Sequence, residues 1–551
     1  MTYYDLGVYK RPVTTTSPEA QLWFDRGLNW VFGFNFEAAV KCFAKAVEHD
    51  PKCAMAHWGV AYAAGPNYNL PWELQDPLSK AAALAASYDA MQKALACARN
   101  ATPVEQALIS ALPARYPQRE PIEDQSGWDK DFTRAMRKVF EMYRDDLEVR
   151  SVFVEAIMGE TPWKMWDLAT GGYAKGAGTE EAMKVLEEAF RDQPRSWEHA
   201  GLLHLYVHLM EMSPFPQRAL RAGDKLREIM PDSGHLVHMP THIDVLCGNY
   251  HDVVVYNQKA VVADRKYLAN EGAMNIYTMY RLHNLHFVIY GAMFLGQYTP
   301  AIAAAEEIIA TTPDAVLRIK VPPFADFVEG FISMKQHVLV RFGKWHEILA
   351  QKLPDDREVY CSTTAMMLYA KGVAHSILGN IEEAEKTRAA FLAAKARVPD
   401  SRLVHNNTVT SLLGIAEAML TGEFEYRRRN YDVAFAHLRR SVALNDSLLY
   451  DEPWGWMQPT RHALGALLLE QGQMAEAEAV YRADLGFDGK LSRACQHPDN
   501  VWSLHGLHEC LVRRGDKIET PLVKSRLDLA LARAEVPIQA SCFCRRKAMA
   551  A

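Results

Sequence analysis

The spacing of small and aromatic residues over residues 20–53 is the feature that most constrains how this chain folds. Counted as a 34-residue unit from residue 20, marked residues fall at positions 4, 8, 11, 20, 24, 27 and 32, and these are Trp23, Gly27, Trp30, Ala39, Phe43, Ala46 and Pro51. Small residues such as Gly27 and Ala39 let two helices pack closely, and Phe43 fills the groove between them. Pro51 ends the second helix because proline lacks a backbone N–H. The stretch therefore predicts a pair of antiparallel helices.

The same spacing returns in four later stretches of the chain. Small residues again occupy positions 8, 15 and 20, and they include Gly296, Ala301, Gly372, Gly379, Ala384, Gly422, Ala434, Gly465, Gly472 and Ala477. This pattern resembles the tetratricopeptide repeat, in which each helix pair buries its apolar face against its neighbours. The sequence thus predicts an all-α fold, a tetratricopeptide-like superhelix of antiparallel helix pairs with long inserted loops.

The expected organisation has three parts. Residues 1–18 form an N-terminal extension, residues 19–515 form the superhelix with a histidine cluster at 199–290, and residues 516–551 form a C-terminal helix and a flexible tail. Two stretches rich in Pro, Gly and Trp, "GPNYNLPWE" and "GETPWKMWDLATGGYAKGAGT", are predicted to be loops inserted between helices. Loops of that length in a compact array are often functional.

Composition excludes several classes of function. The chain has 551 residues and a net charge of -6 with no long basic run, so no nucleic-acid surface is expected. No stretch reaches about eighteen uninterrupted apolar residues, and the N-terminus lacks the apolar core of a secretory signal, so neither a membrane span nor secretion is expected. The nine cysteines include no CxxC pair, which indicates free thiols and a cytoplasmic location. Cys542 and Cys544 lie beside two arginines, where a frayed tail, lipidation or metal binding are the alternatives.

Histidines gather in three consecutive first helices of the predicted pairs, in "HLYVHLME", "GHLVHMPTHI" and "RLHNLHFVIY". In the repeat frame they fall at positions 2, 5 and 9, with one glutamate at position 12, and the set is His204, His208, Glu211, His235, His238, His242, His283 and His286. These positions share one helix face. In tetratricopeptide proteins that face lines the concave groove, so the resemblance implies that the histidines converge there.

A metal site is the first interpretation of this cluster. Two neutral imidazoles at i and i+4 can bind one ion at about 2.1 Å each, and a neighbouring helix completes the set. The predicted ligands of one zinc, copper or iron ion are His204, His208, His235, His238 and His242. His283 and His286 would close the coordination sphere or bind substrate. A histidine-lined groove for an organic ligand and a polar lining without a ligand remain the alternatives.

Four further residues are candidates for the site. Glu211 could be a metal ligand, a hydrogen-bond partner of an imidazole, or a general base for bound water. Glu155, in "VFVEAIM", is an acid in an apolar helical run and must be paired or have a perturbed pKa, so it is a second catalytic candidate. Asn67 could reach substrate or form a local turn. Arg461 could bind substrate or form an ion pair with Glu452.

Longer motifs resemble a widespread family of large tetratricopeptide proteins, most of which have no assigned activity. The motifs are "CAMAHWGVAYAAGPNYN", "PWKMW", "HLYVHLMEMSPFPQRAL", "PDSGHLVHMPTHI", "HNLHF", "VRFGKWHEIL", "EPWGWMQPTRHALGALLLEQGQMAEAEAVYRADL" and "DNVWSLHGL". They occur in this order over roughly residues 18–515. The resemblance implies the fold and the histidine site, and it supplies no reaction.

The function expected from these residues is that of a metal-dependent enzyme acting on a small organic substrate. HExxH, GxGxxG, GxxxxGK[ST] and GxSxG motifs are absent, so chemistry would have to run through a bound metal. Zinc would imply hydrolysis or elimination, whereas copper or iron would imply oxidation. The alternatives are a scaffold that binds a protein or peptide through the repeat surface without catalysis, and a metal carrier or sensor.

Overall fold

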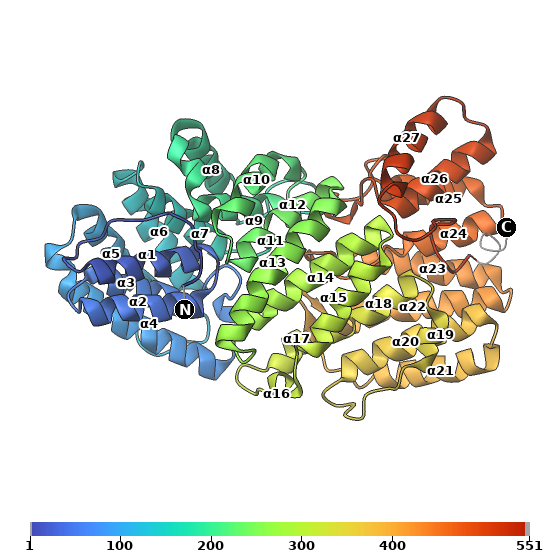
Figure 1. The fold of residues 1–551 in the computed structure, drawn as a ribbon, viewed down its shortest axis with the longest axis horizontal. Coiled ribbons are helices and arrows are strands. Elements are labelled where there is room, and N and C mark those ends of the chain that lie inside the picture. The colour runs from blue at the N-terminus through green and yellow to red at the C-terminus, as the bar shows by residue number, and fades with distance from the viewer. Residues whose placement is uncertain (1–2, 546–551) are drawn as a thin grey trace. The chain divides into compact units, whose positions relative to one another are not determined.

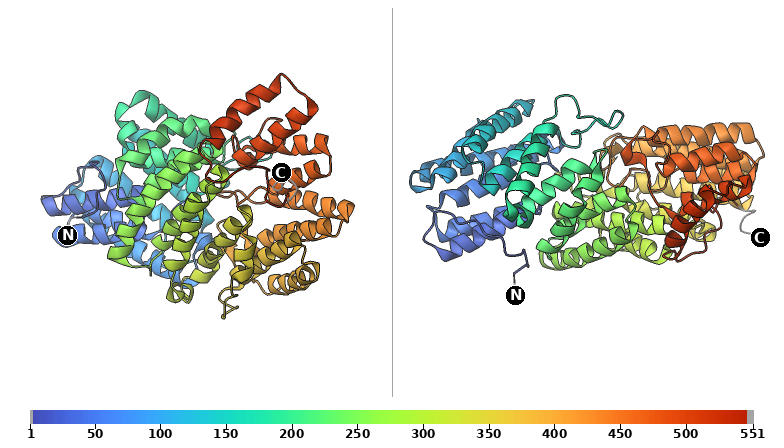
Figure 2. Two further views of the ribbon diagram at one scale, coloured as in Figure 1. Left: turned by 45° about the vertical axis from the view of Figure 1, so that its right-hand side comes forward. Right: turned by 90° about the horizontal axis from the view of Figure 1, so that it is seen from above.

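The computed structural model describes residues 3–545 and divides the chain into two compact units. Unit 1 is the chain up to Ile243 together with Val262–Asn270, and unit 2 is Asp244–Val261 together with the chain from Glu271 onward. Figures 1 and 2 show that helices make up nearly all of the regular structure. Within the described residues the only sheet is an antiparallel hairpin of β1 (Leu403–Val404) and β2 (Asn407–Thr408). The predicted all-α fold of antiparallel helix pairs is confirmed.

The helices of unit 1 follow one another in the order of the chain. They are α1 (Pro18–Phe32), α2 (Phe36–His49), α3 (Ala54–Ala64), η1 (Trp72–Leu74), α4 (Pro77–Cys97), η2 (Ala98–Asn100), α5 (Pro103–Arg115), α6 (Ser126–Met142), α7 (Leu147–Gly159), α8 (Thr179–Asp192), η3 (Pro194–Glu198), α9 (Ala200–Glu211), η4 (Pro216–Ala219), α10 (Leu220–Ile229) and α11 (Gly234–His238). The short elements labelled η are 3₁₀ helices. Local sequence sets the boundaries, since Ser17 caps the first helix and Thr102 forms a capping box with Glu105.

Two helices contribute to both units, and they are α12 (Pro240–Cys247) and α13 (Tyr250–Glu271). The helices of unit 2 are α14 (Tyr277–Leu295), α15 (Tyr298–Ala310), α16 (Asp314–Leu317), α17 (Phe324–Ile332), α18 (Met334–Arg341), α19 (Trp345–Ala350), α20 (Cys361–Leu378), α21 (Ile381–Lys395), α22 (Val409–Arg427), α23 (Tyr431–Asp446), α24 (Arg461–Glu470), α25 (Met474–Asp484), η5 (Arg493–Cys495), α26 (Val501–Arg514) and α27 (Glu519–Leu531). In Figures 1 and 2 the pairs α20 with α21 and α22 with α23 run side by side.

An aromatic ring wedged between glycines holds consecutive helices together, as the repeat spacing predicts. A Cβ atom on Gly27 of α1 would lie 2.7 Å from the ring of Phe43 of α2, and one on Gly59 of α3 would lie 2.4 Å from it. Tyr481 of α25 is placed in the same way, 2.5 Å from a Cβ on Gly465 and 2.2 Å from one on Gly506. Each ring therefore packs against the backbone of the helix before it and of the helix after it.

Both predicted insertions are irregular segments. Residues 65–76 join α3 to α4 and contain only one short 3₁₀ helix, and residues 160–178 join α7 to α8 with an isolated bridge between Trp166 and Tyr173. Among residues 3–545, no helix combines the length and apolar character needed to cross a bilayer.

The C-terminal cysteines differ from the free thiols expected. Cys542 and Cys544 are joined by a disulfide, whereas the other seven cysteines are free. The segment around them packs into unit 2, where Oγ of Ser541 donates to the carbonyl of His462 at 2.8 Å. The free-thiol interpretation was therefore wrong for this pair, because spacing in sequence did not show that the tail folds back onto the helices.

Candidate metal centre

Helix α9 carries the first histidines into the interior of unit 1. All of its residues are buried, so His204, His208 and Glu211 lie in the core rather than on an open groove surface. Gly201 allows this placement, because a Cβ there would lie 2.6 Å from the ring of Phe32 and 2.8 Å from the hydroxyl of Ser151. The helix thus packs tightly against α1 and α7.

The next histidines lie on a helix that proline divides. α11 ends at His238, Met239 forms its C-cap, and α12 begins at Pro240, which has no N–H to continue the first helix. His235 and His238 therefore belong to one short helix and His242 to the next, and all three are buried.

Three imidazoles from α9 and α11 converge on one point. One ring nitrogen from each of His204, His208 and His235 lies within 4.8 Å of the corresponding nitrogens of the other two. The ring centroid of His204 lies 4.7 Å from that of His208 and 4.9 Å from that of His235. Three imidazoles at such separations match the ligand set of catalytic zinc sites, which leave a fourth position for water or substrate.

Glu211 links the two groups of histidines by hydrogen bonds. Its Oε1 accepts from Nδ1 of His208 at 2.9 Å, and its Oε2 accepts from Nδ1 of His242 at 2.6 Å. Nδ1 of His204 in turn donates to the carbonyl of Phe32 at 2.7 Å. These bonds place the proton on Nδ1 and leave the lone pair on Nε2. Metal-binding histidines commonly have this tautomer, with Nδ1–H donating to a carboxylate or a backbone carbonyl.

His238 extends the network from the other side. Its Nε2 lies 2.7 Å from Nε2 of His242, so one of these imidazoles donates to the other. Because Nδ1 of His242 already donates to Glu211, the neutral form of His242 accepts at Nε2 and His238 donates. Within unit 1, the metal-ligand prediction thus separates into a three-histidine group and a hydrogen-bonded pair behind Glu211.

The ring of Phe34 packs against all three imidazoles of the three-histidine group. The ring centroid of Phe34 lies 4.3 Å from that of His204, and its ring stacks on His208 at 5.5 Å and on His235 at 5.8 Å. Phe34 has a φ of 51°, in the left-handed region that costs a non-glycine residue about 1 kcal/mol or more. The turn between α1 and α2 therefore holds a strained backbone at the position that puts this ring on the histidines.

Residues from the two inserted loops also pack against α9. Tyr68, from the loop after α3, places its ring centroid 4.9 Å from that of His208. Nε1 of Trp166, from the loop after α7, donates to the carbonyl of Leu209 at 2.7 Å. The hydroxyl of Tyr68 accepts from the backbone N–H of Trp163 at 3.2 Å, so the two loops also contact each other.

Burial among other imidazoles keeps His235 neutral. Desolvation, followed by repulsion from His204, His238, His208 and His242, holds the pKa of His235 well below its usual value. A neutral imidazole is the form that ligates a metal.

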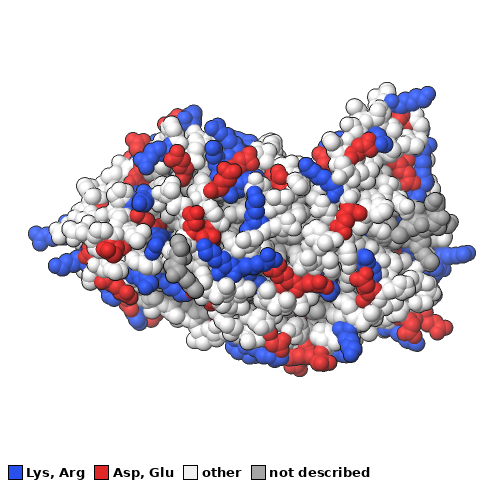
Figure 3. All heavy atoms as spheres, viewed as in Figure 1, with Lys and Arg blue, Asp and Glu red and all other residues white. Residues whose placement is uncertain are grey.

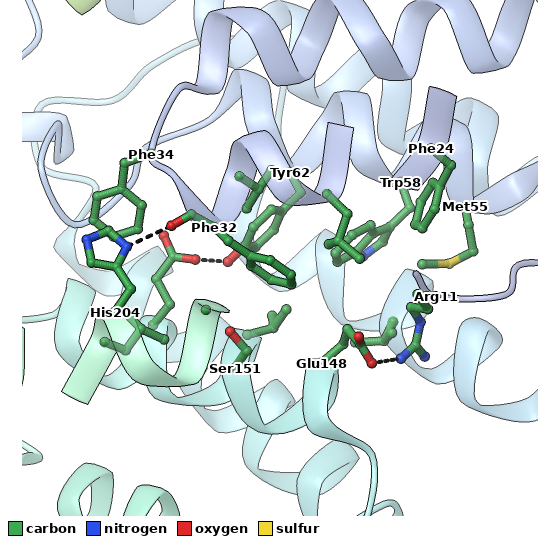
Figure 4. Close-up of a pocket in the computed structure, with 17 residues that line it drawn as sticks. Arg11, Phe24, Phe32, Phe34, Met55, Trp58, Tyr62, Glu148, Ser151 and His204 are labelled. Atoms are coloured by element: carbon green, nitrogen blue, oxygen red, sulfur yellow. Dashed lines mark hydrogen bonds and ion pairs between the residues drawn. The ribbon is translucent and has the colours of Figure 1, made fainter. Parts of the chain in front are cut away.

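A mostly apolar pocket lies beside His204. It encloses about 500 Å³ of atom-free space, its open mouth included. Figure 4 shows His204 and Phe34 at one end and the Arg11–Glu148 ion pair at the other, with aromatic rings between them. The pocket could accept a small molecule that is largely apolar and carries one polar end.

The predicted catalytic residue Glu155 lines this same pocket. Tyr62 donates a short hydrogen bond to its Oε2. Burial raises the pKa of Glu155, while the guanidinium of Arg115 and the bond from Tyr62 oppose that rise. Arg115 itself stacks over the ring of Tyr62 at 4.8 Å and donates to the carbonyl of Pro66 at 2.7 Å. Glu155 is thus both paired and perturbed.

The two remaining substrate-binding candidates make local contacts. Oδ1 of Asn67 accepts from the backbone N–H groups of Asn69 and Leu70 at 3.0 Å each, which is the turn-forming alternative, and Asn67 also lines a second pocket beside Glu155. Arg461 forms a bidentate ion pair with Asp446, at 2.6 and 2.5 Å, so its carboxylate partner is not the one expected from sequence.

His283 and His286 belong to unit 2, where a third histidine that sequence reasoning missed meets them. His405 lies in the turn between β1 and β2, and one ring nitrogen from each of the three lies within 4.8 Å of the others. The sequence around it, "LVHNNT", signals a turn through its asparagines. Nothing in that signal relates the turn to a helix more than a hundred residues earlier.

The surface carries both signs of charge. On the face drawn in Figure 3, Lys and Arg side chains are intermixed with Asp and Glu side chains.

No protein-family model and no curated protein sequence matches the chain. Among solved structures it is similar to the APC/C hetero-tetramer Cut9–Hcn1, with 12% identity, a TM-score of 0.28 and 96% of each chain covered. It is also similar to the P58(IPK) TPR domain, with 14% identity, a TM-score of 0.19, and 82% of this chain and 99% of that chain covered.

Proposed function

We propose that unit 1 binds one transition-metal ion through His204, His208 and His235, and that the bound ion serves a reaction on a small organic molecule. The observation that carries the proposal is the position of Glu211, whose two oxygens accept from Nδ1 of His208 and Nδ1 of His242. A carboxylate behind an imidazole fixes the ring with Nε2 directed away from it, and this is how ligand histidines are commonly oriented.

The residues present fit a metal of the zinc, copper or iron class. Imidazole suits all three, and neutral His235 needs no proton removed before it ligates. An ion held there would polarise a substrate oxygen or activate a bound water. The chain's own residues would bind the substrate in the adjoining pocket, with apolar rings around its body and Arg11 at the polar end. Glu155, with its raised pKa, would hold a proton at the pocket wall.

A protein-binding scaffold is the second candidate, and the fold class by itself favours it, since helical-repeat arrays commonly bind protein partners. One surface feature adds to this. Leu522 and Leu529 are 65% and 73% exposed, and their spacing of seven residues places them on one face of α27. Ile518, the residue that precedes the helix, is 84% exposed. An exposed apolar stripe of this kind often marks a protein contact.

Metal analysis of the full chain, purified without an affinity tag, tests the first proposal. We expect about one equivalent of zinc, copper or iron in the parent and none in a His204→Gln, His235→Gln double variant. His346→Gln, which alters an exposed histidine, is the matched control. A parent that neither contains nor takes up such a metal would overturn the proposal and leave the scaffold as the function to pursue.

Cobalt substitution separates an enzyme from a carrier. Co²⁺ reports its coordination through visible absorption bands, and azide changes those bands only when it reaches the ion. We expect azide to change the spectrum, because a three-histidine set leaves one position open. A spectrum that azide does not change would indicate a closed site and exclude the catalytic part of the proposal.

A further inference from the structure

We propose that His283, His286 and His405, together with the thioether of Met457, form a copper(I)-binding site within unit 2. This inference does not depend on the metal in unit 1, because it rests on different residues and on a soft donor that the unit 1 group does not use. Its evidence is the convergence of three imidazoles and one sulfur from three separate segments.

The imidazole spacing fits a shared ion. Nδ1 of His283 lies 3.1 Å from Nε2 of His405. Two nitrogens bound tetrahedrally to one ion at about 2.1 Å lie roughly 3.4 Å apart. The ring of His286 stacks on that of His405 at 5.7 Å, with a nitrogen within the same 4.8 Å limit. A hydrogen bond between His283 and His405 is the alternative explanation of their contact, and the experiment below separates the two.

The sulfur of Met457 distinguishes this group from an ordinary zinc site. Sδ of Met457 lies 2.6 Å from Nε2 of His286, so it is within reach of an ion bound beside that imidazole. Thioethers are soft ligands that favour copper(I), whereas zinc sites in proteins are built from imidazole, thiolate and carboxylate. Adding one thioether to three imidazoles therefore favours copper(I).

Separate elements hold the donors in place. His283 and His286 are one helical turn apart on α14. His405 has a φ of 49°, a left-handed conformation that is uncommon for residues other than glycine, and it lies in the turn of the hairpin. Such a residue persists only where the surroundings fix it, and this is a common property of ligand-binding positions.

The loop that carries Met457 also fixes the hairpin. Nδ2 of Asn407 donates to Oδ2 of Asp451 at 2.9 Å and to the carbonyl of Leu449 at 3.1 Å. The backbone N–H of Leu449 donates back to Oδ1 of Asn407 at 3.0 Å. Loop and hairpin are thus one hydrogen-bonded body, so the positions of the sulfur and of the His405 ring are set together.

The surroundings are apolar and aromatic. The ring of Phe331 lies 5.4 Å from that of His286 and 5.2 Å from that of His405, edge to face in both cases. His283 likewise meets Phe287 at 5.0 Å. An apolar shell around soft donors favours the lower charge of copper(I) over a divalent ion, because a smaller charge costs less to desolvate.

Copper(I) titration of the full chain tests the site. The protein is titrated anaerobically with Cu⁺ in ascorbate, against the coloured chelator bicinchoninate. We expect His405→Asn to bind one equivalent fewer than the parent, since asparagine tolerates the left-handed backbone and removes the imidazole. Met457→Leu, which keeps the side-chain volume, should weaken that equivalent by roughly tenfold or more while leaving Zn²⁺ binding unchanged.

Matched controls exclude a general effect on folding. His346→Asn alters an exposed histidine of unit 2, and Met366→Leu alters a buried methionine there, and both should bind like the parent. X-ray absorption of the copper-loaded parent should show a sulfur neighbour that Met457→Leu lacks. Equal copper stoichiometry in the parent and in folded His405→Asn would overturn the site. Unchanged copper affinity in Met457→Leu would overturn the role of the thioether.

Discussion

Oε2 of Glu211 accepts the Nδ1–H of His242 at 2.6 Å, which is the shorter of the two hydrogen bonds that this carboxylate receives from histidines. One side chain at the end of α9 thereby fixes rings on two different helices. The consequence is that the orientations of His208 and His242 depend on one and the same carboxylate.

Replacing that carboxylate by an amide should weaken metal binding without unfolding the protein. Glu211→Gln keeps one acceptor and turns the other into a donor that faces an imidazole N–H. We expect the affinity for Zn²⁺ to fall by about 10- to 100-fold. Competition with a fluorescent zinc chelator measures the change. Glu187→Gln, at a glutamate that accepts from Tyr206 at 2.9 Å, is the control and should leave affinity as it is.

Comparing two substitutions of Phe34 should measure the backbone strain in the turn between α1 and α2. Phe34→Ala removes the ring and keeps a left-handed residue with a side chain, whereas Phe34→Gly removes the ring and the strain together. We therefore expect the glycine variant to be more stable than the alanine variant by about 1 kcal/mol. Urea unfolding of both proteins measures the difference. Equal stability of the two variants would show that the turn is not strained.

Replacement by alanine should have opposite effects on stability at Gly506, which packs against the ring of Tyr481, and at Gly414, which does not. A Cβ on Gly506 would lie 2.2 Å from that ring, so Gly506→Ala should destabilise the protein by about 1–3 kcal/mol or more. Gly414, in the middle of α22, has no neighbouring atom within 4 Å of such a Cβ. Gly414→Ala should instead stabilise by about 0.5–1 kcal/mol. Thermal unfolding of the two variants checks the opposite signs.

Asp129 should make stability fall as the pH rises. Desolvation raises the pKa of its carboxyl from 3.8 to about 7, although Arg115 opposes the shift. A raised folded-state pKa means that the native protein holds a proton which the unfolded chain has lost, so stability declines between about pH 4 and pH 7. A fully buried shift of this size would amount to about 4 kcal/mol, and because the Asp129 side chain is partly exposed we expect about 2 kcal/mol.

The Asp129→Asn variant isolates the contribution of this carboxyl to the free energy of unfolding. The variant should gain stability over the parent at pH 8 and little at pH 4, where both carry a neutral side chain. Asp131→Asn, an exposed acid on the same helix, is the control. A stability gain that is the same at both pH values would contradict the assigned ionisation.

The fold could be predicted because its determinants are local. Repeated small residues at fixed spacing, with Phe43 between them, define where two helices touch, and these contacts recur within one repeat length. The irregular loops were also visible, since Pro, Gly and Trp interrupt the helical spacing. The disulfide of Cys542 was not, because its tail packs through contacts with distant helices.

The site could be predicted only as far as helical periodicity reaches. His204 and His208 share a face by spacing alone, and Glu211 follows at the next turn. His405 lies in a different element, and its approach to His283 is a property of how helix and hairpin pack. The partner of Arg461 was missed for the same reason, because Asp446, which forms the ion pair, lies at the end of the preceding helix and farther from Arg461 along the sequence than Glu452.

The wedge of Phe43 has a consequence for how unit 1 unfolds. Its ring packs against Gly27 of α1 and Gly59 of α3. If either helix detaches, one face of the ring is exposed to solvent while its other face is still packed. Nearest-neighbour coupling of this kind makes adjacent repeats melt together. Deleting α1 and α2 should therefore lower the free energy of unfolding by more than the contribution of these two helices alone. The next helix pair would also lose the Phe43 ring that covers its end.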